Sequence, residues 1–138
     1  MAPTNSFPPS STSPVSPTAN RLLWALQILL ALAFLGGGVS KLVGTAYMVN
    51  LFDQIGMGNW FRYLTGVIEV VSSVALLVPG WARFGALNLV GVMAGAVATH
   101  LFQIGGSPIP ALVLLALVGA IAWGRRYQAL LPWASMRA

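Results

Sequence analysis

The sequence predicts an all-α fold, a polytopic membrane four-helix bundle with an amphipathic interfacial helix between the first and second spans. Of the 138 residues only 7% are charged, whereas about a quarter of the residues of a soluble protein are charged. Three apolar segments have the roughly 20 residues that a helix needs to cross the core of a bilayer, and a shorter fourth follows. This bundle uses nearly all of the chain, which leaves no room for a second domain.

Composition also excludes several functional classes. The formal net charge is +5, but the basic residues are scattered and form no stripe that could follow a nucleic-acid backbone. We therefore expect no nucleic-acid partner and assign these residues to topology and to contacts with the lipid bilayer. The chain has no cysteine, which excludes disulfides and thiol redox chemistry by the chain itself. We expect no metal site and see no evident cofactor motif, so a redox role would use a bound cofactor or a partner.

The two ends of the chain differ from the apolar region between them. Residues 1–20 are rich in Pro, Ser and Thr. They carry no basic residue that could form the positively charged start of a signal peptide. We predict a disordered cytoplasmic tail, which acts as a tether or binds a regulatory partner. The transmembrane domain is predicted over residues 21–126, and residues 127–138 form a short C-terminal tail.

The first predicted span covers Leu22 to Val43, with Asn20 as its expected N-cap. Three consecutive glycines at residues 36–38 would allow another backbone to come close. Lys41 follows them. Its long side chain reaches either outward to the lipid headgroups or inward as the counter-ion of Glu69.

The segment from Gly44 to Asn59 is too short and too polar to cross a bilayer. Its apolar residues recur at helical spacing, at Tyr47, Met48, Leu51, Phe52 and Ile55. We predict an amphipathic helix that lies along the membrane interface and covers the mouth of the bundle.

The second predicted span runs from Trp60 to Gly80 and carries Glu69 near its middle. A carboxylate at this depth costs about 3 kcal/mol on insertion scales, so Glu69 needs a partner, a proton or a wet cavity. The short turn at residues 79–80 makes the second and third spans antiparallel neighbours.

The third span is predicted from Trp81 to Phe102 and the fourth from Ala111 to Trp123. Gly91 and Gly95 form a small-xxx-small pair in the third span. We predict that this pair packs against another helix of the same chain, with a homodimer interface as the alternative.

Charge predicts the topology of the spans. Both termini and the turn near residue 80 fall on one side, which carries Arg21, Arg83, Arg125, Arg126 and Arg137. The other side carries only Lys41 and Arg62 as basic residues. The excess of positive charge places the N and C termini in the cytoplasm of a multi-pass protein of the cell membrane.

The polar residues of the spans are predicted to meet in one pocket open to the outer side. Tyr63, Glu69 and Ser73 recur at helical spacing on one face of the second span. Facing them we expect Lys41 of the first span and His100 and Thr99 of the third span. Gln27 and Asn88 are candidates nearer the cytoplasmic half. These candidates define a ligand or proton site, and no residue is assigned a catalytic role.

Two interpretations of this pocket remain open. In the first, Glu69 is structural, either protonated because burial favours its neutral form or paired with Lys41. In the second, Glu69, Lys41 and His100 bind a polar head group such as a quinone ring or a small metabolite, and His100 moves protons.

The order and spacing of several short motifs resemble the DoxX-like family of small four-helix integral membrane proteins. The first span ends in FLGGGVSKL, and the following loop has the form F-x-x-x-G. The remaining motifs are G-x-x-E at residues 66–69, L-L-x-P-G at residues 76–80 and M-x-G-A-x-x-x-H at residues 93–100. The resemblance implies a four-helix membrane bundle, with Lys41, Glu69 and His100 at positions that match the family's polar pattern.

For function, the resemblance implies an association with membrane oxidoreductase systems, since the family takes its name from a subunit linked to thiosulfate:quinone oxidoreduction. We expect an accessory subunit or assembly partner of a membrane or soluble oxidoreductase. The alternatives are a quinone-interacting oxidoreductase subunit and a small-solute or proton-coupled carrier. The sequence leaves open whether the chain is itself an enzyme.

Overall fold

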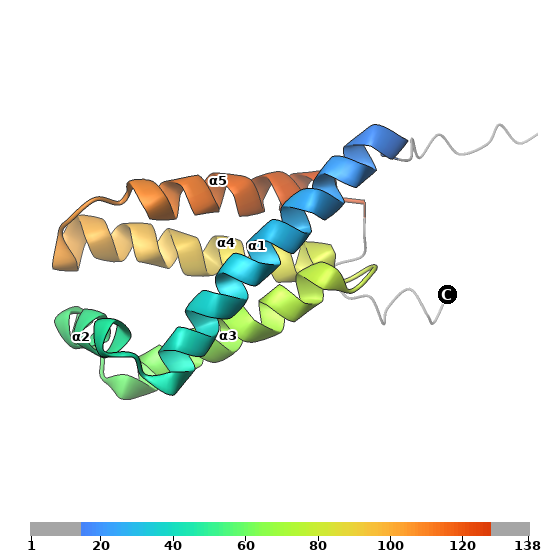
Figure 1. The fold of residues 1–138 in the computed structure, drawn as a ribbon. Coiled ribbons are helices and arrows are strands. Elements are labelled where there is room, and N and C mark those ends of the chain that lie inside the picture. The colour runs from blue at the N-terminus through green and yellow to red at the C-terminus, as the bar shows by residue number, and fades with distance from the viewer. Residues whose placement is uncertain (1–14, 128–138) are drawn as a thin grey trace, which may run out of the picture.

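The computed structural model describes residues 15–127 and confirms the all-α prediction (Figure 1). The helices are α1 (Pro17–Val43), α2 (Ala46–Ile55), α3 (Asn59–Leu77), α4 (Ala82–Thr99), the π-helical turn η1 (His100–Ile104) and α5 (Ile109–Gly124). Three helical stretches, α1, α3 and α4 continued by η1, are long and apolar enough to span a membrane, and α5 is apolar but shorter. The described part of the chain is thus a helical membrane bundle. The predicted tails lie mostly outside the described residues.

The helices form two pairs that meet along α3 and α4. Helix α1 packs across α3, and α4 packs beside α5 (Figure 1). The start of α1, the α3–α4 turn and the end of α5 lie at one end of the bundle. At the other end the two pairs diverge, and α2 and η1 approach each other there.

The first helix begins earlier than the sequence predicted. Ser16 is the N-cap, and its side chain accepts a hydrogen bond from the Ala19 amide at 3.2 Å. Pro17 follows as a residue suited to the first helical turn. The prediction of Asn20 as the N-cap and Leu22 as the start was wrong, because Asn20 lies inside the helix.

Glycines set the closest helix contacts. A Cβ added to Gly38 would lie 3.0 Å from the Gly66 carbonyl oxygen, so α1 and α3 cross backbone to backbone at these two residues. A Cβ on Gly85 would lie 2.6 Å from the Ser72 carbonyl oxygen, which shows an equally close contact between α3 and α4. The core between the pairs is made by Leu30, Ala31, Phe34, Leu76, Ala86, Leu89, Met93, Val118 and Ile121.

A buried polar network holds the ends of α1, α3 and α5 together. The Gln27 side-chain nitrogen donates to the Leu76 carbonyl at 2.6 Å, and its oxygen accepts from Arg125 Nε at 2.8 Å. Arg125 Nη1 donates to Asn20 Oδ1 at 2.8 Å. Gln27 was predicted on the cytoplasmic side of the pocket; it lies in the half of the bundle nearer the start of α1 and does not line the cavity.

Candidate functional site

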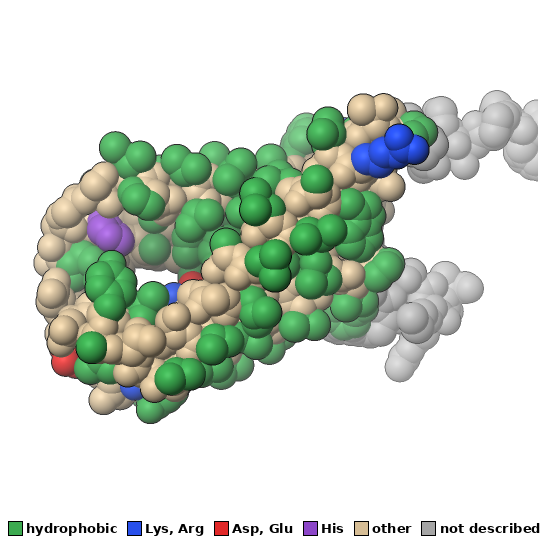
Figure 2. Space-filling view, viewed as in Figure 1, with side chains coloured by type: hydrophobic (Ala, Val, Ile, Leu, Met, Phe, Trp, Pro, Cys, Tyr) green, Lys and Arg blue, Asp and Glu red, His purple; other side chains and the backbone are tan. Residues whose placement is uncertain are grey.

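A cavity of about 470 Å³ lies where the two helix pairs diverge, between α2, α3, α4 and η1. Figure 2 shows it as an opening through the molecule, with an acidic and a basic side chain at its edge. Its lining is mostly apolar and comprises Lys41, Leu51, Phe52, Ile55, Met57, Phe61, Thr65, Ile68, Glu69, Asn88, Gly91, Val92, Met93, Gly95, Ala96, Thr99, His100 and Ile104.

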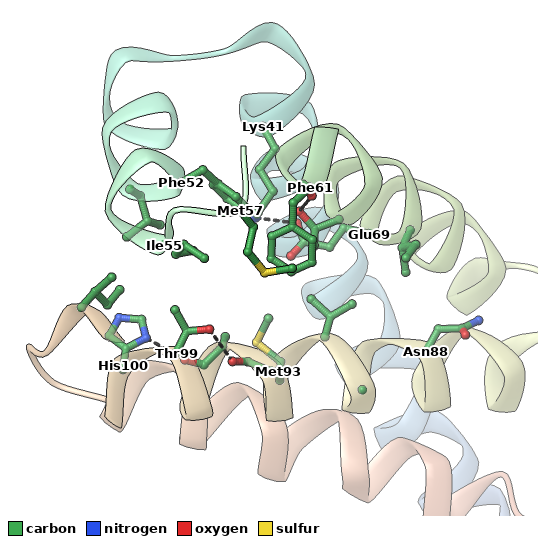
Figure 3. A pocket seen from close by; sticks show the side chains of 18 residues that line it. Lys41, Phe52, Ile55, Met57, Phe61, Glu69, Asn88, Met93, Thr99 and His100 are labelled. Atoms are coloured by element: carbon green, nitrogen blue, oxygen red, sulfur yellow. Dashed lines mark hydrogen bonds and ion pairs between the residues drawn. The ribbon is translucent and has the colours of Figure 1, made fainter. Parts of the chain in front are cut away.

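Lys41 and Glu69 form an ion pair at the inner side of this cavity (Figure 3). Lys41 Nζ lies 2.8 Å from Glu69 Oε2, and only 2% of the glutamate side chain is exposed, against 13% of the lysine side chain. The lysine therefore turns inward as the counter-ion rather than outward to the headgroups. A carboxylate buried this deeply needs such a partner.

The antiparallel crossing of α1 and α3 explains why these two side chains meet. Lys41 follows Gly38 by about one helical turn, and Glu69 follows Gly66 by the same distance along α3. Side chains tilt toward the N-terminus of their own helix, so in two antiparallel helices these two side chains tilt toward each other. The pair lies over Gly37, where an added Cβ would be 3.5 Å from Glu69 Oε2.

Two further polar side chains hold the backbone around the pair. The buried Arg62 guanidinium donates through Nη1 to the Lys41 carbonyl oxygen and so fixes the end of α1. Ser73 donates to the Glu69 carbonyl oxygen at 2.6 Å. Both residues support the ion pair without lining the cavity.

His100 is the first residue of η1 and lines the opposite side of the cavity (Figure 3). Its Nδ1 lies 2.9 Å from the Ala96 carbonyl oxygen. Because a carbonyl can only accept, Nδ1 carries the hydrogen, and Nε2 of the neutral ring is then an acceptor. Thr99 beside it donates to the Gly95 carbonyl oxygen at 2.8 Å.

The two broad walls of the cavity differ in character. On the side of α2 and α3, the large side chains Phe52, Met57 and Phe61 project into it (Figure 3). On the α4 side lie Gly91 and Gly95, where an added Cβ would have no neighbour within 4 Å. The predicted packing of this glycine pair against another helix was therefore wrong, since the pair borders open space instead.

The predicted site residues divide into two groups. Lys41, Glu69 and His100 line one cavity, together with Thr99 and Asn88. Tyr63 and Ser73 do not line it.

Tyr63 lies outside the cavity because the preceding residue, Arg62, takes the buried position at the start of α3. Tyr63 is 48% exposed, and the Arg62 guanidinium carbon lies 4.4 Å from the centroid of the Tyr63 ring.

Arg62 and the aromatic residues Phe52 and Phe61 were not predicted as site residues. A signal for Arg62 was present, because residues 62, 66, 69 and 73 follow helical spacing and all four are buried on one face of α3. For Phe52 and Phe61 the apolar pattern alone could not separate cavity-lining residues from ordinary packing residues.

The bundle and this cavity define a polytopic helical membrane protein with one charged pair set in an apolar cavity. Residues 25–125 match the model of the DoxX-like family, and this protein therefore belongs to the DoxX-like family. It is similar to a protein of Bacillus subtilis (strain 168), YdgD, described as uncharacterized. The two are 29% identical over an alignment of 91 residues, which covers 63% of this chain and 80% of the relative. No solved structure is significantly similar to the chain.

Proposed function

We propose that this membrane protein binds the head group of a quinone in the cavity beside Lys41 and Glu69, and that it serves as a subunit of a membrane oxidoreductase system. The observation that carries the proposal is the placement of a buried ion pair in a mostly apolar cavity of about 470 Å³. That volume falls within the range of roughly 300–1,000 Å³ typical of small-molecule sites, which combine apolar walls with a few polar groups.

The residues present fit a quinone head group. The Lys41 ammonium has three donors, of which Glu69 takes one, so it can also donate to a ring carbonyl oxygen. The apolar walls suit the ring and the first part of a hydrocarbon tail. A quinone accepts two electrons and two protons when it is reduced. The electrons would come from the partner oxidoreductase.

His100 is suited to a proton role at this site. In the neutral ring its Nε2 is free to accept a proton on the side of the cavity opposite Glu69. We assign His100 to proton exchange between the cavity and the membrane surface, and Lys41 with Glu69 to binding.

The same proposal includes an orientation with both termini in the cytoplasm of a cell-membrane protein. Arg21 near the start of α1, Arg83 near the start of α4 and Arg126 just after α5 fall at the same end of the bundle. At the opposite end, the charge of Lys41 is paired with that of Glu69, and Arg62 is buried with its guanidinium hydrogen-bonded to the Lys41 carbonyl oxygen. This asymmetry is typical of a cytoplasmic side rich in basic residues.

Titration of the purified protein in lipid nanodiscs with a short-chain benzoquinone and a short-chain naphthoquinone tests the proposal. The matched control is the double variant Lys41→Met with Glu69→Leu, which removes both charges together and leaves neither one unpaired. Saturable binding by the natural chain that the double variant lacks is the expected result. Absence of binding by the natural chain, or equal binding by both proteins, would overturn the proposal.

A further inference from the structure

The glycines of the membrane helices differ in what surrounds them, and Gly36 and Gly119 have no neighbour within 4 Å of an added Cβ and do not line the cavity. Gly38, Gly66 and Gly85 touch the backbone of a neighbouring helix, so each has a packing reason to lack a side chain. Gly91 and Gly95 touch no neighbour within 4 Å of an added Cβ, and both line the cavity that holds the ion pair. Helix packing therefore does not explain why these two residues have no side chain.

The two glycines lie one turn apart on α4, about 6 Å at the helical rise of 1.5 Å per residue. At these two positions the cavity wall is helix backbone, and the side chains of Val92 and Ala96 line the wall beside them. Neither carbonyl needs to be satisfied by a ligand, because Gly95 O accepts from Thr99 and an α-helix supplies its own backbone hydrogen bonds. The stretch of the wall without side chains is thus about the length of two fused six-membered rings.

Across the cavity lie Phe61 and Met57, which supply an aromatic face and a polarisable sulfur (Figure 3). Aromatic rings and thioethers both make favourable contacts with flat conjugated rings. Lys41 and Glu69 lie at the inner edge of the same space. The cavity is therefore a slot with two apolar walls and one charged edge.

We propose that Gly91 and Gly95 are specificity-determining residues, a platform on which the flat ring of the ligand lies with its polar edge toward Lys41. This inference rests on the proposed quinone site and deepens it: the site takes a planar ring system, and the bare backbone at these positions sets how thick and how wide that ring can be. A side chain here would occupy the space of the ring while leaving the helix contacts of the bundle intact.

The test compares quinone binding by Gly91→Ala, Gly95→Ala and Gly95→Leu with binding by the natural chain, in nanodiscs. Gly119→Ala and Gly119→Leu are the matched controls, because Gly119 of α5 also has no neighbour within 4 Å of an added Cβ but does not line the cavity. Alanine and leucine favour helix more than glycine does, so the variants are expected to fold. The thermal midpoint of each variant checks this directly.

We expect each alanine at the platform to weaken binding by roughly tenfold, the order of effect that one methylene has in an apolar pocket, and Gly95→Leu to abolish it. The Gly119 variants should bind like the natural chain. If the natural chain binds quinone and all platform variants bind equally well, the platform is refuted while the quinone site stands. If the natural chain does not bind either quinone, the proposed function itself is refuted.

Discussion

Lys41 and Glu69 meet at 2.8 Å only because α1 and α3 cross in antiparallel directions at Gly38 and Gly66. Each side chain tilts back along its own helix and so toward the other. Lys41 and Glu69 are 28 residues apart in the sequence, and the contact between Gly38 and Gly66 brings them together. The position of this ion pair in the cavity therefore depends on how α1 and α3 cross.

The first prediction concerns the stability of this pair. Lys41→Met should lower the free energy of unfolding by about 3–5 kcal/mol, because it leaves a buried carboxylate unpaired. Glu69→Gln should cost less, since the amide oxygen still accepts from Lys41 and the lysine reaches the cavity. The double variant Lys41→Met with Glu69→Leu should have a free energy of unfolding close to that of the natural chain. Thermal midpoints in detergent check the order, and a double variant as unstable as Lys41→Met alone would contradict it.

The second prediction separates packed glycines from cavity glycines. Gly85→Ala should destabilise the protein by about 1–3 kcal/mol, because an added Cβ would lie 2.6 Å from the Ser72 carbonyl oxygen. Gly91→Ala and Gly95→Ala should be neutral or stabilising by up to about 1 kcal/mol, since alanine favours helix and meets no neighbour. Thermal unfolding of the three variants measures this difference. Equal destabilisation at Gly85 and Gly91 would show that α4 packs differently.

The third prediction concerns the polar network at the other end of the bundle. Gln27→Leu should cost about 1–3 kcal/mol, because it leaves the Leu76 carbonyl and Arg125 Nε without their buried partner. A double-mutant cycle with Arg125→Leu should give a coupling free energy clearly different from zero. Additive effects of the two substitutions would mean that the contact does not contribute to stability.

The fourth prediction concerns orientation, and the natural absence of cysteine makes it direct to measure. Gln54 is exposed on α2, and Pro79 is exposed in the α3–α4 turn, so each can be replaced by a single cysteine, as Gln54→Cys and Pro79→Cys. A membrane-impermeant maleimide added to intact cells should label the first and not the second. Permeabilised cells should show labelling of both. The reverse pattern in intact cells would invert the topology.

The sequence predicted the helices well because bilayer thickness fixes their length and hydropathy marks them directly. It also predicted that Glu69 needs a partner, with Lys41 as one candidate, because an unpaired charge at that depth is costly. The choice between the two orientations of Lys41 depended on a helix crossing that the sequence could not locate. The structure resolved it through the contact of Gly38 with Gly66.

Other features could not be predicted for definite physical reasons. The spacing of Gly91 and Gly95 is the same whether their helix face meets another helix or a cavity. The motif alone could therefore not distinguish helix packing from cavity lining. Arg125 follows the last span, where a basic residue is ordinarily interfacial, yet only 8% of it is exposed because Gln27 and Asn20 accept its hydrogen bonds. Long-range partners of this kind are set by tertiary packing.

The central claim is that the cavity beside Lys41 and Glu69 holds a quinone. The most direct measurement is native mass spectrometry of the protein extracted gently from its own membrane, with the natural chain compared with the Lys41→Met, Glu69→Leu double variant. We predict a bound species with the mass of a membrane quinone on the natural chain and its loss from the double variant. A natural chain without bound quinone, or a quinone retained equally by the double variant, would contradict the claim.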